Sequence, residues 1–262
     1  MNYDSYRCIE AERRGRILTL TLNNPPLNAV DDVIHEELAR IFADVQLDDE
    51  ADIVVLTGAG RAFSAGGDLN QMKEAYAEGE MRLTLVDAKR IVFSLLDLEK
   101  PIIARVNGHA MGLGATIALF CDVIYMSTAA RIADPHVSIG VVAGDGGAVI
   151  WPQLIGYARA KEYLMTGKPL TGEEAARIGL VNHAVAPEDL DEAVYGFAEE
   201  LAAGPQKAIR WTKVSANIGL KQLAHSIMDT SLAYEWITFK TEDHGEAIDA
   251  FLEKRKPNFT GA

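Results

Sequence analysis

Short apolar runs rich in β-branched residues alternate along the first half of the chain with longer segments of helical period. Four runs have the length and composition of buried strands: Ile17 to Leu22, Ile53 to Thr57, Ile102 to Val106 and Val123 to Ser127. Strands that alternate with helices are joined by crossover connections, which favour parallel pairing. The pattern therefore predicts an α/β fold with a mainly parallel sheet.

Two of the connecting segments have the apolar spacing of amphipathic helices. The first begins after Asp31 or Asp32, either of which can cap it. Its apolar face consists of Ile34, Leu38, Ile41, Phe42 and Val45. The apolar face of the second consists of Leu85, Val86, Ala88, Ile91, Val92, Leu95 and Leu96. The polar segment from Gln71 to Gly79 is expected to be mobile, and the segment from Gln71 to Glu80 is expected to shape a pocket.

Two further helices are predicted from their boundaries. One begins at about Ala148 and contains Trp151. The other opens with the capping box Thr171 to Glu174 and ends at Gly179, since a glycine commonly closes a helix in the left-handed conformation.

Beyond Pro187 the pattern is entirely helical, with expected breaks at Gly204-Pro205 and near Gly219. The composition shifts near residue 195. We therefore expect residues 1–195 to form the core and residues 196–262 to form a helical appendage.

Composition and charge exclude several classes of protein. A chain of 262 residues can bury about 70–75% of its unfolded surface, enough for a substantial core. The formal net charge of −13 argues against a nucleic-acid or anionic-membrane binder. Cys8 and Cys121 are interpreted as reduced thiols, and neither a signal peptide nor a long apolar run is found. We therefore expect a cytoplasmic protein.

Two glycine-rich segments follow predicted strands. Val106 to Thr116 reads Val-Asn-Gly-His-Ala-Met-Gly-Leu-Gly-Ala-Thr, and the strand ending at Thr57 leads into Phe63 to Leu69, Phe-Ser-Ala-Gly-Gly-Asp-Leu. A turn between a strand and a helix start leaves backbone N–H groups unpaired, and these can hold an anion. The alternative is that the glycines only permit tight turns.

The pair of segments resembles the oxyanion-hole motifs of the crotonase superfamily, also called the enoyl-CoA hydratase/isomerase family. The similarity extends from the first strand to Phe259. It implies a spiral of ββα units with a C-terminal helical region that packs between subunits, as trimers or dimers of trimers. It also implies an acyl-CoA substrate whose developing oxyanion is held by the backbone N–H groups of Gly67 and Leu113.

The same resemblance implies contacts with coenzyme A, which would enter only as part of the substrate. The implied contacts are Pro26, Leu27, Ala65, Asp68, Leu69 and Asn70, with Phe251 and Lys254 reaching a neighbouring subunit. Asn70 stands where relatives often carry a lysine. Phe251 and Lys254, three residues apart, are expected on one helix face. For Lys254 a solvated basic terminus is an equal alternative, and Phe251 by itself reads as a core residue.

The family's hydratases use two glutamates, and Thr116 and His136 stand at those positions. A threonine hydroxyl is too weak an acid or base to replace a carboxylate, so ordinary hydratase chemistry is not expected. His136 can transfer protons near neutral pH. Asp145 lies within one residue of a position where some relatives carry a catalytic aspartate. For His136 the alternative is a pocket histidine whose hydrogen bonds are satisfied and which has no catalytic role. For Asp145 the alternative is a turn or cap residue before the following helix.

These observations predict an enzyme that stabilises a thioester enolate, with Asp145 or His136 as the base. Isomerase, decarboxylase or hydrolase chemistry is favoured over an enoyl-CoA hydratase with substitute residues or a non-catalytic acyl-CoA-binding protein. The histidines and cysteines lack metal-ligand spacing, and no serine-hydrolase elbow, P-loop or dinucleotide motif is present. No metal or redox cofactor is expected.

Overall fold

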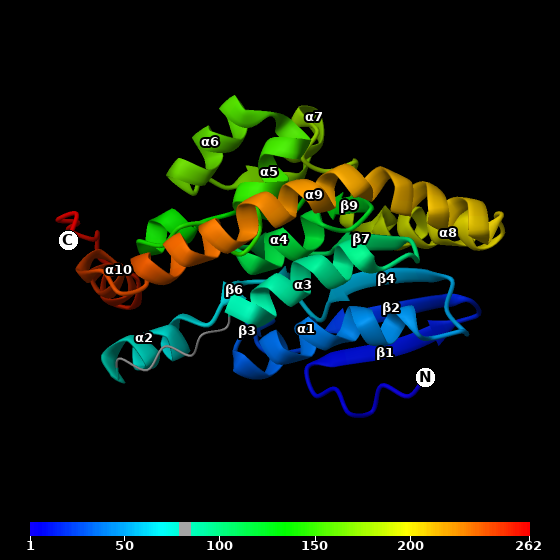
Figure 1. Cartoon of the computed structure of the whole chain (residues 1–262), viewed down its shortest axis with the longest axis horizontal. Coiled ribbons are helices and arrows are strands. Elements are labelled where there is room, and N and C mark those ends of the chain that lie inside the picture. Colours follow the sequence, from blue (N-terminus) through cyan, green and yellow to red (C-terminus); the bar gives the residue numbers. More distant parts are fainter. Residues whose placement is uncertain (79–84) are drawn as a thin grey trace.

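A six-stranded sheet forms the centre of the molecule in a computed structural model that describes residues 1–78 and 85–262 (Figure 1). Its strand order is β1-β2-β4-β7-β9-β12, with β1 antiparallel to β2 and every later pair parallel. The predicted mainly parallel sheet is therefore confirmed. The strands are β1 (Ile9–Arg14), β2 (Ile17–Leu22), β4 (Ile53–Gly58), β7 (Ile102–Val106), β9 (Val123–Ser127) and β12 (His183–Val185).

Both faces of this sheet are buried along β2, β4, β7 and β9, which explains why these strands read as continuous apolar runs. In β4, Val54 and Leu56 belong to the larger core cluster, whereas Ile53 and Val55 face the smaller one. The helix α8 (Leu190–Ala202) covers the smaller cluster. The alternation follows from the two-residue period of a strand.

A smaller sheet contains the short strands that follow β4, β7 and β9, together with one strand that lies between two helices. β5 (Ala62–Ser64), β8 (His109–Met111), β10 (Arg131–Ala133) and β11 (Leu170–Thr171) form it in the order β11-β10-β8-β5. In each repeat a strand of the large sheet leads to a strand of the small sheet and then to a helix. This arrangement confirms the predicted crotonase-like spiral of ββα units.

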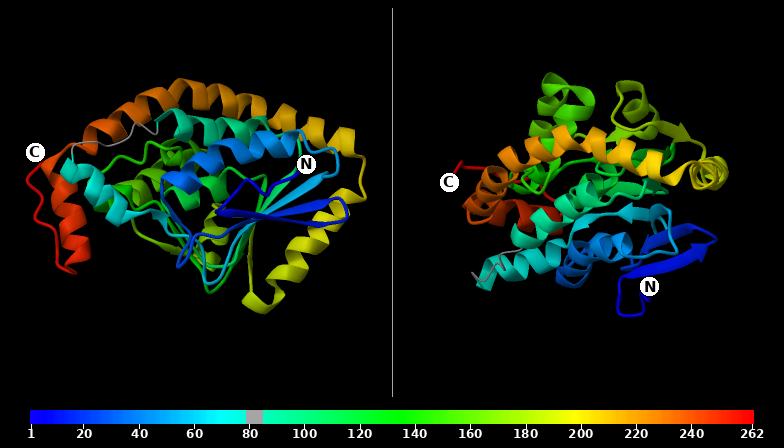
Figure 2. Two further views of the ribbon diagram at one scale, coloured as in Figure 1. Left: turned by 90° about the horizontal axis from the view of Figure 1, so that it is seen from below. Right: turned by 45° about the vertical axis from the view of Figure 1, so that its right-hand side comes forward.

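The helices surround the two sheets (Figure 2). They are α1 (Asp32–Gln46), α2 (Leu69–Glu78), α3 (Leu85–Asp97), α4 (Leu113–Leu119), α5 (Gly147–Ile155), α6 (Tyr157–Thr166), α7 (Gly172–Ile178), α8, α9 (Gln206–Thr238) and α10 (Glu242–Leu252), with the short 3₁₀ helices η1 (His136–Ile139) and η2 (Pro187–Asp189). Asp31 caps α1 through its carboxylate, and Thr171 with Glu174 forms the predicted capping box of α7. Gly179 ends α7 in the left-handed conformation, as predicted.

Residues Gln71 to Glu78 lie in helix α2, whose first turn is capped by the Asp68 carboxylate, which accepts hydrogen bonds from the N–H groups of Asn70 and Gln71. Four residues of this segment line a cavity, so the prediction that it shapes a pocket is confirmed for the described residues, while its mobility stays a prediction. Gly79 and Glu80, at the end of the segment, lie outside the described residues. The prediction that Val86 lies on the apolar face of α3 is wrong, because Val86 is exposed and lies off the face that Ala88 and Ile91 define.

The predicted break near Gly219 is also wrong, because Gly219 lies inside α9 and does not interrupt it. A glycine in a helix interior costs about 1 kcal/mol relative to alanine. Packing of Ala224, Met228 and Leu232 against the core offsets that cost. The break at Gly204-Pro205 is confirmed, because α8 ends before it and α9 begins after it.

The helix α9 runs across the molecule and ends beside α10, so that the C-terminal region reaches the same end as α2 (Figures 1 and 2). Tyr76 of α2 donates a hydrogen bond to the carbonyl of Thr241, and Lys73 pairs with Asp249. Residue 195, where the composition shifts, lies within α8. Across the described residues, no helix combines the length and the apolar character that crossing a bilayer requires.

Candidate active site

The two glycine-rich segments come into contact. Gly66 has a φ of +80°, and a Cβ atom there would lie 2.7 Å from the carbonyl oxygen of Met111. Gly112 also has positive φ and precedes α4 as its N-cap residue. A side chain at position 66 would hold the segments apart, so the glycine permits their close approach.

The N–H groups of Gly67 and Leu113 are placed to face a ligand. In extended backbone, neighbouring N–H groups point to opposite sides. Since Asp68 N–H bonds to the carbonyl of Val30 in β3 (Ala29–Val30), the Gly67 N–H in β6 (Gly66–Gly67) points away from β3. Leu113 is the first residue of α4, where N–H groups have no partner within the helix.

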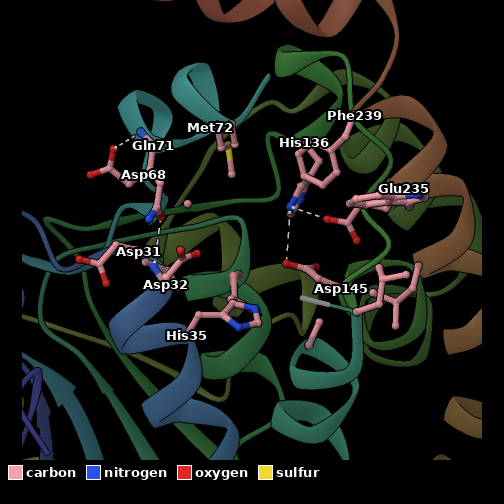
Figure 3. A pocket seen from close by; sticks show the side chains of 18 of the residues that line it. Asp31, Asp32, His35, Asp68, Gln71, Met72, His136, Asp145, Glu235 and Phe239 are labelled. Carbon is pink, nitrogen blue, oxygen red and sulfur yellow. Dashed lines mark hydrogen bonds and ion pairs between the residues drawn. The ribbon is translucent and has the colours of Figure 1, made fainter. Parts of the chain in front are cut away.

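Gly67 and Leu113 both line one cavity of about 360 Å³, which His136 and Asp145 also line. Figure 3 shows His136, Asp145 and Glu235 pointing toward one another, while His35 enters from α1. The remaining lining residues are Val30, Asp31, Asp32, Asp68, Gln71, Met72, Glu74, Ala75, Leu85, Ala88, Leu232, Trp236 and Phe239. Segments far apart in the sequence therefore build one site.

A buried acid-base cluster occupies one wall of this cavity. The His136 Nδ1 atom lies 2.5 Å from Asp134 Oδ1, and its Nε2 atom lies 3.5 Å from Asp145 Oδ2 and 3.9 Å from Glu235 Oε1. The Thr116 hydroxyl donates to Asp145 Oδ1 at 3.3 Å. Because all five residues are buried, these groups interact with one another more strongly than they would in water.

Burial and neighbouring charge shift the pKa values of this cluster in opposing ways. Burial alone would lower the pKa of His136, but the carboxylates of Asp134, Asp145 and Glu235 raise it well above its ordinary value. Burial raises the pKa of Asp145 despite the nearby imidazole. The pKa of Glu235 rises well above its ordinary value through burial and through the Asp145 charge. The cluster is therefore suited to exchanging protons near neutral pH.

Local backbone geometry aims Asp145 into the cavity. The loop before α5 is clamped by α9, whose Ser231 hydroxyl donates to the carbonyl of Gly144 at 2.8 Å. Gly146 follows with a φ of +131°, a conformation that side chains rarely adopt. The one-residue offset noted in the sequence thus leaves the Asp145 carboxylate facing His136.

Three side chains of this cluster have the proximity of metal ligands, since ligand atoms of Asp134, His136 and Asp145 all lie within 4.8 Å of one another. The 2.5 Å between His136 Nδ1 and Asp134 Oδ1 is a hydrogen-bond distance. Two atoms that ligate one zinc ion at about 2.1 Å in tetrahedral geometry lie about 3.4 Å apart. The pair therefore fits a shared proton, and the absence of a metal cofactor stays a prediction.

The residues implied to contact coenzyme A are only partly collected at the cavity. Asp68 lines it, and Leu27 lies beside the loop because its carbonyl accepts the Ala65 N–H. Leu69 and Asn70 form the first turn of α2, while Pro26 lies in the turn before β3. Their contacts with coenzyme A stay predictions.

The expectation that Phe251 and Lys254 share a helix face is wrong. The helix α10 ends at Leu252, and Lys254 lies beyond it with a φ of +57°. Phe251 is 62% exposed, so it is not a core residue of this chain. Neither residue lines the cavity, and their role toward a neighbouring subunit stays a prediction.

Sequence reasoning missed Glu235, Asp134 and His35. Glu235 follows Met228, Ser231 and Leu232 at helical spacing, so a carboxylate on the buried stripe of α9 was the available signal. Asp134 lies two residues before His136, and no local signal in the sequence marks it as its partner. His35 precedes the buried Leu38 by three positions, and its Nδ1 atom is buried without a hydrogen-bond partner among the described residues.

The cavity wall is acidic. Its lining residues within the described chain include carboxylates and two histidines but no lysine or arginine. The acidic members are Asp31, Asp32, Asp68, Glu74, Asp145 and Glu235. A neutral or partly protonated ligand is therefore accommodated more easily than a polyanion.

Comparisons with known proteins agree with this architecture. The family model described as enoyl-CoA hydratase/isomerase matches residues 12–262. A short-chain-enoyl-CoA hydratase of Clostridium acetobutylicum is 36% identical over 94% of each chain. The crystal structure of an enoyl-CoA hydratase/isomerase from Mycobacterium paratuberculosis matches with a TM-score of 0.88 and 37% identity, covering 92% of this chain and 97% of that one.

A further solved structure is a β-diketone hydrolase from the cyanobacterium Anabaena, bound to (S)-3-oxocyclohexyl acetic acid. It matches with a TM-score of 0.84 and 29% identity, covering 91% of this chain and 96% of that one.

Proposed function

Because this chain belongs to the enoyl-CoA hydratase/isomerase family, we propose that it is an enzyme that hydrolyses a bond beside a carbonyl group held in its cavity. The observation that carries the proposal is the buried Asp134–His136 pair. The Nε2 atom of His136 faces the cavity that Gly67 and Leu113 also line. An orienting carboxylate, an imidazole and free backbone donors together suit the activation of water.

The backbone N–H groups of Gly67 and Leu113 would hold the carbonyl oxygen as it gains negative charge. The fold fixes both groups before the substrate arrives, so they need no reorganisation during the reaction. One such donor contributes about 3–4 kcal/mol of transition-state stabilisation.

His136 and Asp145 would handle the proton of the attacking water. Asp134 holds Nδ1 and leaves Nε2 toward the cavity, 3.5 Å from Asp145. Water attack forms a bond from its oxygen to the carbonyl carbon, and its proton passes to the His136–Asp145 pair. The tetrahedral intermediate then expels the leaving group, which takes up a proton.

Two substrate classes follow. The family supports an acyl-CoA thioester, with a thiolate as the leaving group. A β-diketone is the second candidate, in which a carbon–carbon bond breaks and an enolate leaves. The acidic cavity wall and the likeness to the Anabaena hydrolase favour this second candidate.

The exposed apolar residues of α9 and α10 support assembly with further copies, as the family resemblance implies. Trp211, Ile218, Tyr234 and Ile237 of α9 and Phe251 of α10 are each more than half exposed. We propose a trimer or a dimer of trimers. Sedimentation equilibrium tests this assembly, and a monomer at micromolar concentration would refute it.

A substrate panel tests the proposed reaction. Purified enzyme is incubated with short acyl-CoA esters, enoyl-CoA esters, malonyl-type thioesters and cyclic β-diketones, and the products are identified by mass spectrometry. Release of a carboxylic acid from a thioester or a diketone is the expected result. Robust hydration, isomerisation or decarboxylation without hydrolysis would contradict it, as would binding of esters without any turnover.

A further inference from the structure

Glu235 belongs to the cavity although it comes from the C-terminal helical region. It lies on α9, is 6% exposed and places Oε1 3.9 Å from His136 Nε2. A Cβ atom at Gly144 would lie 2.7 Å from both Cβ and Oε2 of Glu235. The glycine therefore makes room for this carboxyl group against the Asp145 loop.

Glu235 and Asp145 have different surroundings, although both face His136. Asp145 accepts a hydrogen bond from the Thr116 hydroxyl and another from the Gly147 N–H, and both bonds stabilise its anion. The Oε2 atom of Glu235 has no hydrogen-bond partner among the described residues. Two carboxyl groups in one site with unequal surroundings take different protonation states.

The charge around Glu235 favours its neutral form. The titratable groups nearest to it are Asp134, His136 and Asp145, and no lysine or arginine lines the cavity within the described residues. The imidazole of His136 is already held by Asp134 and faced by Asp145. If Glu235 were ionised, it would be a third buried carboxylate beside His136 and would lack a positive charge to balance it. A buried carboxyl group in such surroundings takes up a proton.

We propose that Glu235 is the general acid of the reaction and gives its proton to the leaving atom. This inference rests on the proposed hydrolysis. As the bond from the carbonyl carbon to the leaving group breaks, the departing thiolate sulfur or enolate carbon takes the Glu235 proton. The water proton held by the His136–Asp145 pair then returns to Glu235, so atoms and charges balance.

The leaving-group dependence of Glu235→Gln tests this role. A leaving group with a low pKa, such as a nitrothiophenolate, departs without a proton, whereas an alkyl thiolate or an enolate carbon needs one. We expect kcat on the second kind to fall about 10²-fold to 10⁴-fold. We expect the rate on the activated thioester to stay close to that of the wild type.

A matched control and a direct readout complete the experiment. Ser231→Ala loosens the same helix from Gly144 and should lower both rates by one common factor. Infrared difference spectra of wild type against Glu235→Gln at neutral pH should contain the C=O stretch of a protonated carboxyl group. Equal losses on both substrates, or the absence of that band, would overturn the inference. If the wild type hydrolyses no substrate, the proposed function fails, and the band still decides the protonation of Glu235.

Discussion

Replacing Asp134 with asparagine tests the acid-base cluster without touching the ligand. Asp134 is 2% exposed, bonds to His136 Nδ1 at 2.5 Å and is not among the residues that line the cavity. Asparagine keeps the shape of the side chain but removes the charge that orients and stabilises the imidazolium. An equivalent loss in a histidine-based site lowers kcat about 10⁴-fold, or about 5.4 kcal/mol of barrier.

The assay is steady-state hydrolysis of the best substrate from the panel, measured across pH. Because Asp134 does not line the cavity, KM should change little while kcat falls. Asp52→Asn is the matched control, since Asp52 pairs with Arg16 and Arg210 and does not line this cavity. If Asp134→Asn retained more than a tenth of the wild-type kcat, or if Asp52→Asn lost as much, the assignment of His136 would be refuted.

Other predictions follow from the same structure. If His136 must be unprotonated to act, the rate should rise with pH with an apparent pKa above 6.5. Asp134→Asn should move this rise to lower pH, because it removes a carboxylate that raises the pKa of His136. An unchanged pH profile would count against His136 as the base. Gly66→Ala should destabilise the fold by at least 1–2 kcal/mol, roughly the cost of a left-handed non-glycine residue, and should lower kcat by separating the two backbone donors. Urea unfolding measures the loss of stability and steady-state kinetics measures the loss of kcat. Wild-type values for both would contradict the prediction. Asp48 is buried, which raises its pKa, but hydrogen bonds from Arg13, Tyr3 and the Glu50 N–H outweigh this effect and lower the pKa to about 2. The wild type should therefore lose about 2 kcal/mol of unfolding free energy as pH falls from 4 to 2. Asp48→Asn should not show this loss.

Much of the fold could be predicted because its periodic signals are strong. The central parallel strands are buried on both faces, so they appear as continuous apolar runs such as Ile53 to Thr57. Asp31 and Thr171 are local capping signals that need no tertiary information. The helix α2 was missed because its apolar stripe, Leu69, Met72 and Tyr76, is narrow among polar residues, and its stability depends on the Asp68 cap and on contacts with α10.

The site could be predicted only in part, because its members come from distant segments. His136 and Asp145 were accessible through resemblance, and their facing geometry required the loop that Ser231 clamps. Glu235 lies 90 positions beyond Asp145, and its one local signal, a carboxylate on the buried stripe of α9, does not say which site it enters. Its role depends on Gly144 and on a cavity lining that, in the described part of the chain, includes no lysine or arginine, and only the assembled cavity reveals both.

The central claim is that water attacks a carbonyl carbon held beside His136, and oxygen labelling tests it most directly. A single turnover of the wild-type enzyme is run with the substrate that the panel identifies, in D₂O that is also labelled with ¹⁸O. One ¹⁸O atom in the product carboxylate, absent in Asp134→Asn, is the predicted result. A product with deuterium at the α-carbon but no ¹⁸O in its carboxylate, or with ¹⁸O at the β-carbon, would contradict the account.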